Sequence, residues 1–294
     1  MPCQLLALLT LLTAPAGAAT FQVADAMVKD QVVAGASIQI ESAPGEVVAT
    51  GVTDAQGRWT VDLEPGTWLV SYAADGYVPI GRSPTALDAS DQVVTTALTM
   101  MLEALGTPGV RRVQVVLTWG SDLDQVPDAD SHLVCACPEG AEVYFGDREH
   151  AGDGHSVDLD VDDVDWGGPE TITLVDPPPG AYTYFVRNFS GPPHRLGSSD
   201  VVVRVLFGDE LAREYRVPES MDDEDWFPFR ALQVGEDLAP RLVDWTPEEL
   251  AAGADRRTGP LYHLSCTWVA LLCVGLSVLG VLALVVFRVA RRRS

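Results

Sequence analysis

The chain has 294 residues and a formal net charge of −23. All 42 acidic residues lie between residues 19 and 263, whereas four of the 19 basic residues follow the last apolar segment. A surface this acidic repels nucleic acid and anionic lipid, so it excludes a nucleic-acid-binding role and favours cations or basic molecules as partners. The length between the two apolar ends, about 245 residues, suits two domains of ordinary size.

The amino terminus has the pattern of a secretory signal peptide at residues 1–18. An apolar core runs from Leu5 to Leu12 and is followed by Ala16-Gly17-Ala18, an A-x-A cleavage sequence. We therefore expect cleavage after Ala18 and an ectodomain that faces the outside of the cell or a lumen.

The carboxyl terminus predicts a single transmembrane helix at residues 264–287. This segment contains no charged residue, and its length matches the hydrocarbon core of a bilayer. Arginines dominate the remaining residues 288–294, which places this short tail in the cytoplasm by the positive-inside rule. The chain is therefore expected to be a type I membrane protein. A lipid anchor and a cleaved sorting signal are the alternatives, and the arginine tail disfavours the lipid anchor.

Residues 19–104 alternate apolar and polar side chains in short runs, with glycine, proline and aspartate between them. Examples of such runs are ASIQIES, RWTVDL and TWLVSYA. This spacing predicts a β-sandwich.

Four motifs in this first region resemble the carboxypeptidase regulatory-like domain. They are VAGA at 33–36, GVTDAQGRW at 51–59, LEPGTW at 63–68 and DGY at 75–77. The resemblance implies a transthyretin-like sandwich with a spacer or adhesive role. It implies no peptidase activity, because the catalytic zinc domain of such carboxypeptidases has no counterpart here. We expect the aromatic residues Trp59, Trp68 and Tyr77 to belong to the core.

A turn-rich linker at 106–109 separates the first region from a second predicted β-sandwich at 108–245. Its motifs are LTW at 117–119, DADSHL at 128–133, VYFG at 143–146, LDVDD at 159–163 and GPETI at 168–172. They resemble the YfaP-like family of secreted bacterial β domains, and this resemblance implies a fold but no activity. The predicted architecture is thus all-β, with two tandem sandwiches ahead of the transmembrane helix.

A stalk at residues 246–263 connects this domain to the membrane. Thr246 as N-cap, Pro247 at the first helical position and Glu249 at the third predict a short helix that begins there.

Acidic residues of the second domain form the main candidate site. Asp128 and Asp130 share one strand face, Asp158, Asp160 and Asp162 share another, and the following turn adds two more aspartates. Oxygen-rich sites of this kind bind Ca²⁺, although solvated strand faces would produce the same pattern. The predicted metal residues are Asp128, Asp130, Asp158, Asp160, Asp162, Asp163 and Asp165. Zinc is a weaker alternative, with His132, His150, His155 and Asp153 as its ligands.

Two cysteines and one sequon belong to the second domain. If Cys135 and Cys137 lie in a regular strand, they are about 6.6 Å apart along it, which is too far for a disulfide. We therefore expect buried free thiols and an ectodomain that does not depend on disulfides. Asn188 begins the sequon Asn-Phe-Ser and is a candidate glycosylation site.

No catalytic motif is present: the sequence lacks G-x-S-x-G, H-E-x-x-H, a P-loop and G-x-G-x-x-G. An enzyme is therefore not expected. We expect a single-pass surface protein that binds or adheres to a protein or glycan, with Ca²⁺ as the one candidate cofactor. The alternative is an accessory subunit of a membrane complex that has no ligand of its own.

Overall fold

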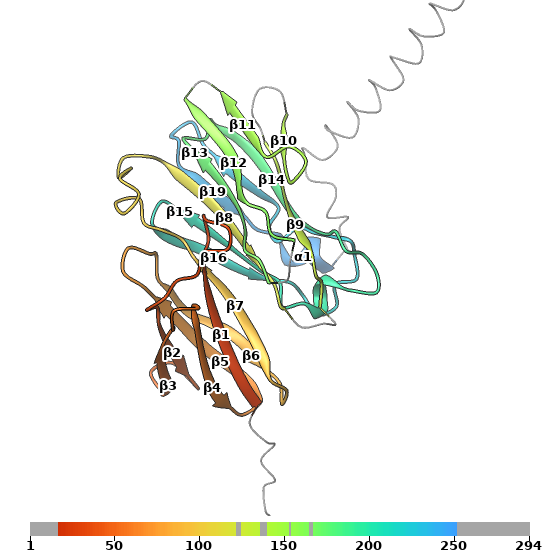
Figure 1. The fold of residues 1–294 in the computed structure, drawn as a ribbon. Helices are drawn as coiled ribbons and strands as arrows, with labels where there is room; N and C mark the ends of the chain where they lie inside the picture. The colour runs from red at the N-terminus through yellow and green to blue at the C-terminus, as the bar shows by residue number, and fades with distance from the viewer. Residues whose placement is uncertain (1–16, 122–124, 136–139, 153, 165–166, 252–294) are drawn as a thin grey trace, which may run out of the picture.

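The computed structural model describes residues 17–121, 125–135, 140–152, 154–164 and 167–251 (Figure 1). Within these ranges, no helix combines the length and the apolar character that crossing a bilayer requires. The predicted transmembrane helix at 264–287 and the tail at 288–294 lie outside them, as do most of the signal peptide and of the stalk. Gly17 and Ala18 are described, and they begin the first strand. Cleavage after Ala18 stays a prediction.

The described chain is all-β apart from two short helical turns, which confirms the all-β part of the predicted fold class. The first sandwich places a three-stranded sheet, in the order β4-β1-β7, against a four-stranded sheet, in the order β3-β2-β5-β6. β1 pairs in parallel with β7, and its other neighbour β4 is antiparallel. The strands are β1 Gly17–Asp25, β2 Ser37–Glu41, β3 Val47–Val52, β4 Arg58–Leu63, β5 Gly66–Ala73, β6 Ile80–Leu87 and β7 Gln92–Leu98.

Alternating side chains of these strands form the core of the first domain. Phe21, Ile38 and Tyr72 are fully buried in it. Trp59, Trp68 and Tyr77 pack against this core from its margin, as the sequence predicts. Trp59 stacks on Phe21 with ring centroids 5.9 Å apart.

The second sandwich contains two larger sheets. One has the order β10-β9-β14-β18-β19, with β17 also paired to β14, and the other has the order β11-β12-β13-β8-β15-β16. The strands are β8 Arg112–Thr118, β9 Ala129–Val134, β10 Glu142–Val143, β11 Glu149–Gly152, β12 His155–Val161, β13 Glu170–Val175, β14 Gly180–Asn188, β15 Val202–Phe207, β16 Glu210–Arg216, β17 Asp225–Trp226, β18 Ala231–Val234 and β19 Pro240–Val243.

Two short helical turns complete the described fold, η1 Leu196–Ser198 and α1 Pro247–Ala251. The capping residues predicted for α1 are confirmed. The Glu249 amide donates to Thr246 Oγ1 at 3.2 Å, and the Thr246 amide donates to Glu249 Oε2 at 2.8 Å. Each terminal donor is therefore satisfied by the side chain of the other residue.

The two sandwiches contact each other along β7, β8 and β15. Ala24, Ala26 and Ala97 of the first domain pack with Val116 and Leu206 of the second in one buried apolar cluster. This cluster lies on the outer face of the sheet that contains β8, because Val115 and Leu117 of that strand face the domain's own core.

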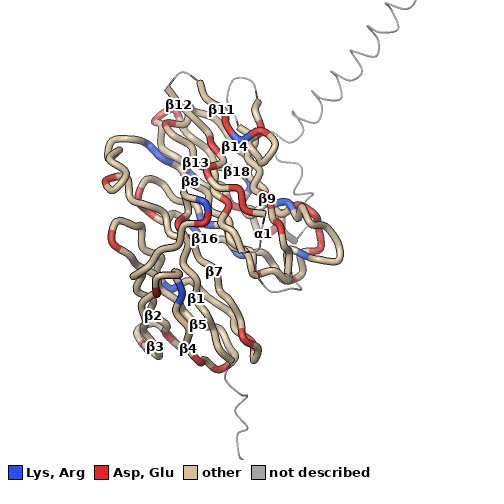
Figure 2. The backbone as a smooth tube through the Cα atoms, viewed as in Figure 1, with Lys and Arg blue, Asp and Glu red and all other residues tan. Residues whose placement is uncertain are grey.

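Polar contacts tie the same interface together. Ser83 of the first domain donates to Glu214 at 2.9 Å, and Arg216 donates to Ser83 Oγ at 2.7 Å. Lys29 Nζ donates to the backbone oxygen of Asp162 at 2.7 Å. The acidic residues are distributed over loops and strands of both domains (Figure 2).

The expected free thiol at Cys135 is wrong, because this cysteine is disulfide-bonded. The expectation assumed a regular strand through Cys137. β9 instead ends at Val134, and the Cys135 amide bonds to the Ala141 oxygen at 2.7 Å, which turns the chain back toward β10. All other cysteines lie outside the described residues, so the partner does too. Complete burial of Cys135 is as predicted.

Candidate functional site: a buried carboxylate cluster

Three carboxylates of the second domain converge where its two sheets meet. Asp128 precedes β9, Asp130 lies in β9, and Glu170 begins β13. One oxygen from each lies within 4.8 Å of the others. β9 and β13 belong to different sheets, so the carboxylate cluster joins the two layers of the sandwich.

A β-bulge brings a fourth carboxylate, that of Asp162, toward this cluster. In the β12–β13 pair Leu159 lies opposite Ile172, but Val161 lies opposite Thr171, so Asp160 is the extra residue. The bulge shifts the alternation of side chains by one position. Asp162 therefore lies on the same face of the sheet as Glu170. Its charge raises the pKa of both Asp130 and Glu170.

Three carboxylate oxygens in this region are buried with no hydrogen-bond partner among the described residues. They are Asp130 Oδ2, Asp162 Oδ1 and Glu170 Oε1. The other oxygen of Glu170 accepts a hydrogen bond from the Ser131 amide at 2.5 Å. A buried polar atom without a partner destabilises the fold by roughly 1–3 kcal/mol, and more when it is charged. The group formed by Asp128, Asp130 and Glu170 could hold an ion.

The protonation equilibria show how strongly these carboxyl groups repel one another. Burial, together with the charges of Asp128 and Asp162, raises the pKa of Asp130 to about 7, and Arg187 opposes this rise. Burial also raises the pKa of Glu170 well above its ordinary value, against the effect of the Ser131 amide. At neutral pH the cluster therefore shares protons unless a cation replaces them.

The two nearby arginines contact Asp225 and Asp162. Arg187 contacts Asp225 through two nitrogens, at 2.8 and 3.2 Å. Arg148 lies 3.5 Å from the outer oxygen of Asp162, Oδ2, and not from the unpartnered Oδ1.

Of the predicted metal residues, the structure brings Asp128, Asp130 and Asp162 together. Asp158 and Asp160 lie on the opposite face of β12, so their assignment to the cluster is corrected. Ser156 donates to Asp158 at 2.7 Å, and Thr173 donates to Asp160. Asp163 follows Asp162 in the loop and is not part of the three-carboxylate group. Asp165 lies outside the described residues.

Of the described zinc candidates, His132 approaches the carboxylate cluster, with Nε2 4.0 Å from Asp130 Oδ2. His132 bonds to Glu142 through Nδ1 at 2.9 Å, whereas His150 and His155 face each other across β11 and β12, with ring centroids 6.2 Å apart. The group of metal-ligating side chains found among the described residues contains no histidine. Asp153 lies outside the described residues.

Glu170 is the ligand residue that the sequence analysis missed. It was quoted only as part of the motif Gly168-Pro169-Glu170. The signal that would have identified it is a carboxylate at the first position of the apolar strand ETITLV, where its side chain faces the core. Such a position is unfavourable for an acid unless it has a partner.

The candidate glycosylation site Asn188 is the last residue of β14 and is 5% exposed. Its Nδ2 donates to the His194 oxygen at 2.7 Å, and its Oδ1 accepts from the Gly191 amide at 3.0 Å. The folded chain therefore buries this amide and holds it in place, so a glycan on Nδ2 would require the surrounding chain to move.

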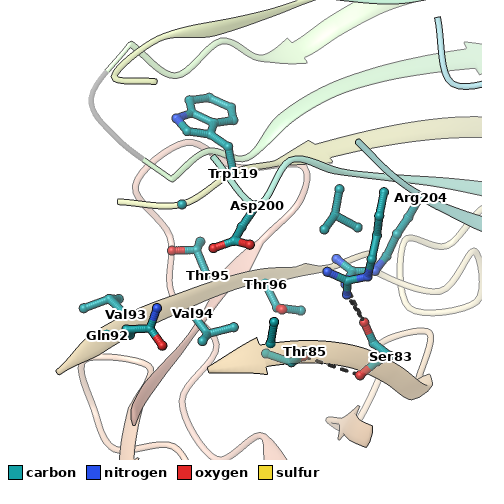
Figure 3. Close-up of a pocket in the computed structure, with 14 residues that line it drawn as sticks. Ser83, Thr85, Gln92, Val93, Val94, Thr95, Thr96, Trp119, Asp200 and Arg204 are labelled. Atoms are coloured by element: carbon teal, nitrogen blue, oxygen red, sulfur yellow. Dashed lines mark hydrogen bonds between the residues drawn. The ribbon is translucent and has the colours of Figure 1, made fainter. Parts of the chain in front are cut away.

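A small enclosed space lies between the two domains (Figure 3). It is lined by Thr85, Thr96 and Trp119 among others, and Arg204 with Ser83 closes one end. Its volume is about 40 Å³, enough for one or two water molecules and too small for an organic ligand. We therefore assign it to the interface.

Comparison with known protein families supports the first domain. Residues 21–101 match the carboxypeptidase regulatory-like domain family, which confirms the predicted resemblance. No curated protein sequence matches the chain.

Three solved structures illustrate the low similarity of this chain to known folds. The chain shares 16% identity with the Bacillus anthracis TIE protein (TM-score 0.27), over 58% of this chain and 28% of that one. It shares 13% with a putative carbohydrate-binding protein from Bacteroides uniformis (TM-score 0.25), over 69% and 97%. It shares 13% with the major pilin SpaD from Corynebacterium diphtheriae (TM-score 0.24), over 70% and 64%. The chain thus spans less than two thirds of the TIE protein and of SpaD, and similarity at this level assigns no function.

Proposed function

We propose that this chain is a single-pass surface protein whose second sandwich binds Ca²⁺ and uses it to support binding or adhesion to a protein or glycan. The observation that carries the proposal is the set of three buried, unpartnered carboxylate oxygens of Asp130, Asp162 and Glu170. Asp128 completes the cluster from the half-buried side.

Ca²⁺ fits this cluster better than other common ions. The three side chains that converge offer carboxylate oxygens, the hard donors that Ca²⁺ prefers, and the His132 imidazole lies beside them, with Nε2 4.0 Å from Asp130 Oδ2. Ca²⁺ also accepts six to eight ligands in irregular geometry, whereas Mg²⁺ requires a near-ideal octahedron. Backbone oxygens and water would complete the coordination sphere.

Ca²⁺ at this position would stabilise one edge of the sandwich. The ligands come from β9, from β13 and from the loop after β12, so one ion links both sheets. The Ser190 hydroxyl also accepts from the Asp128 amide at 3.0 Å, which attaches the 189–194 loop to the same place. A cation would therefore hold the loops at this end in one conformation, as a recognition surface requires.

The membrane part of the proposal rests on the sequence. The apolar segment 264–287 and the arginine tail support a type I topology, and the signal-like residues 1–18 support export. The YfaP-like resemblance of residues 108–245 supports a secreted β domain, and the acidic ectodomain suits partners that carry no strong negative charge. A protease added outside intact cells should remove the ectodomain and leave a tag after Ser294 intact. Loss of the tag would refute this topology.

The experiment for the cation is a Ca²⁺ titration of the full chain in detergent, read by the melting temperature of the second domain. A ligand that binds only the folded state at a hundredfold excess over its Kd stabilises it by about 2.7 kcal/mol. Ca²⁺ at millimolar concentration should therefore raise the melting temperature by several degrees, and Mg²⁺ should raise it less.

Matched variants separate specific binding from screening of an acidic surface. Asp130→Asn combined with Asp162→Asn should abolish the rise, whereas Asp158→Asn combined with Asp160→Asn removes the same charge from the other face of β12 and should preserve it. An equal response of both double variants and the wild type would mean general screening and would remove the basis of the proposal.

A further inference from the structure

One ring nitrogen of His132 is buried and lacks a hydrogen-bond partner among the described residues. His132 lies in β9, its side chain is 3% exposed, and the nitrogen concerned is Nε2. Oδ2 of Asp130, two residues earlier on the same face of the strand, is also buried without a partner and lies 4.0 Å from Nε2. Buried polar atoms in folded proteins normally have partners, so two such atoms this close together call for a physical explanation.

The second ring nitrogen of His132 determines what Nε2 offers to a ligand. Nδ1 lies 2.9 Å from Oε1 of Glu142 in β10. An ionised carboxylate only accepts hydrogen bonds, so Nδ1 carries the hydrogen and, in the neutral ring, Nε2 presents a lone pair. Histidines that bind metals have this arrangement, in which a carboxylate accepts the bond from one nitrogen and the other nitrogen contacts the ion.

Two aromatic rings fix the orientation of this imidazole. Tyr144 stacks on it with ring centroids 5.2 Å apart, and Phe185 stacks on it with centroids 4.6 Å apart. A phenylalanine at position 132 would make the same stacking contacts and would leave no buried nitrogen without a partner. The nitrogens are therefore what histidine adds at this position.

We propose that His132 Nε2 and Asp130 Oδ2 bind Zn²⁺ at a position that adjoins the carboxylate cluster. Bonds from Zn²⁺ to imidazole nitrogen and to carboxylate oxygen are each about 2.0–2.2 Å long, so one ion between atoms 4.0 Å apart can contact both. Glu170, which places an oxygen within 4.8 Å of one of Asp130 and has its Oε1 buried without a described partner, supplies a third ligand. A water molecule would complete the tetrahedron that Zn²⁺ prefers.

The imidazole distinguishes this position from the Ca²⁺ site of the proposed function. Ca²⁺ takes oxygen ligands, whereas imidazole suits Zn²⁺ and other transition metals. The two positions share Asp130, so the inference rests on the carboxylate cluster of the proposed function but does not require that Ca²⁺ binds there. His150 and His155, whose rings lie 6.2 Å apart on the hairpin of β11 and β12, provide a matched control pair.

The test is a calorimetric titration of the full chain with Zn²⁺, in detergent, without Ca²⁺ and without a histidine tag. We expect a saturable site. Glu142→Ala removes the carboxylate that orients the ring and should increase the Kd by about 10- to 100-fold. His132→Phe keeps the stacking and removes both nitrogens, so it should increase the Kd by at least about as much. The combination of His150→Gln with His155→Gln should leave the Kd unchanged.

A spectroscopic measurement separates ligation from a structural role of His132. In the His150→Gln and His155→Gln background, substoichiometric Cu²⁺ should show coupling to an imidazole nitrogen in its electron paramagnetic resonance spectrum. The further change His132→Phe should remove this coupling, because Phe has no nitrogen to bind the ion. Persistence of the coupling in that variant would overturn the proposal.

The titrations decide the proposal independently of the Ca²⁺ experiment. A wild type that does not bind Zn²⁺ overturns it, as does a Kd that is unchanged in His132→Phe or that rises only when His150 and His155 are replaced. Equal melting temperatures in EDTA would show that His132→Phe folds. If it does not fold, Glu142→Ala decides, and an unchanged Kd in that variant overturns the proposal. The Ca²⁺-dependent rise in melting temperature should persist in His132→Phe, so failure of one ion to bind is distinguishable from failure of the other.

Discussion

The backbone amide of Ser131 donates to Glu170 Oε2 at 2.5 Å and thereby links the edge of one sheet to the first residue of a strand in the other. This bond holds one oxygen of a side chain that is 1% exposed and leaves the second oxygen facing Asp130 and Asp128. The Ser131 amide thus provides a neutral partner for only one of the two carboxylate oxygens of Glu170. The other oxygen, Oε1, makes this end of the sandwich sensitive to protons and to cations.

Replacing Glu170 by glutamine should separate fold stability from cation binding. The glutamine oxygen can keep the Ser131 bond, while the loss of one buried charge reduces repulsion within the carboxylate cluster. Without Ca²⁺ at pH 8 we expect Glu170→Gln to melt at a higher temperature than the wild type. With millimolar Ca²⁺ this order should reverse. A variant that is less stable under both conditions would show that Glu170 has a structural role only.

The elevated pKa of Asp130 predicts a specific pH dependence of stability. In the folded chain this group keeps its proton up to about pH 7, whereas in the unfolded chain it ionises near 3.8. The folded state therefore binds more protons between these values, and this group's contribution to the free energy of unfolding falls as pH rises from about 4 to 7. Urea unfolding in EDTA should show a fall in the wild type that Asp130→Asn reduces.

Protons and Ca²⁺ should compete for the same oxygens. If one proton is displaced on binding, the apparent Kd for Ca²⁺ should rise about tenfold for each unit of pH decrease below 7. Calorimetric titrations at pH 7.5, 6.5 and 5.5 measure this dependence. A Kd that is independent of pH would place the ion away from Asp130 and Glu170.

Gly51 in β3 should not tolerate a side chain. A Cβ at this position would lie 1.9 Å from Trp59 Cε2, and the ring is held by its stacking on Phe21. We expect Gly51→Ala to destabilise the first domain by about 2–3 kcal/mol through overpacking. Gly81→Ala in β6 has open space around its Cβ and serves as the control. Equal urea midpoints of the two variants would contradict this reading of the core.

Glu214 should be essential to the contact between the domains. Burial alone would raise the pKa of Glu214, but Arg204 and Arg216 hold it below the ordinary value. The resulting stability is present above about pH 4.5 and is lost as pH falls through the lowered pKa. Glu214→Gln leaves the buried Arg204 without its carboxylate and should cost about 3–5 kcal/mol at neutral pH. The exposed Glu210→Gln on the same strand should cost less than about 0.5 kcal/mol in the same urea titration.

Local patterns in the sequence were sufficient to predict the strands and the helix cap. Apolar alternation in RWTVDL and SIQIE depends on neighbours in the chain, and β4 and β2 form there. The cap of α1 involves only residues 246–249, so it too could be predicted from their order.

The residues of the acidic site could not be predicted from the alternation of side chains along a regular strand, because a β-bulge and a contact between the two sheets determine them. The bulge at Asp160 moved Asp162 to the side of Glu170 and left Asp158 on the other face. Glu170 itself joins the site through a strand in the opposite sheet, and that long-range pairing has no local signal. The end of β9 at Val134 similarly invalidated the geometric argument about Cys135.

Lys29 is the one lysine of this chain, and its amine is bonded across the domain boundary to the Asp162 oxygen. Apart from the amino terminus, every amine-directed reagent therefore modifies a single atom at the junction of the two sandwiches. The acylation rate of that atom becomes a direct readout of how long the junction stays closed. The side chain of Asp162 itself lies beside the carboxylate cluster. A fluorescent ester added with and without Ca²⁺ would therefore report whether an ion in the second domain slows the separation of the two domains, and no engineered label is needed.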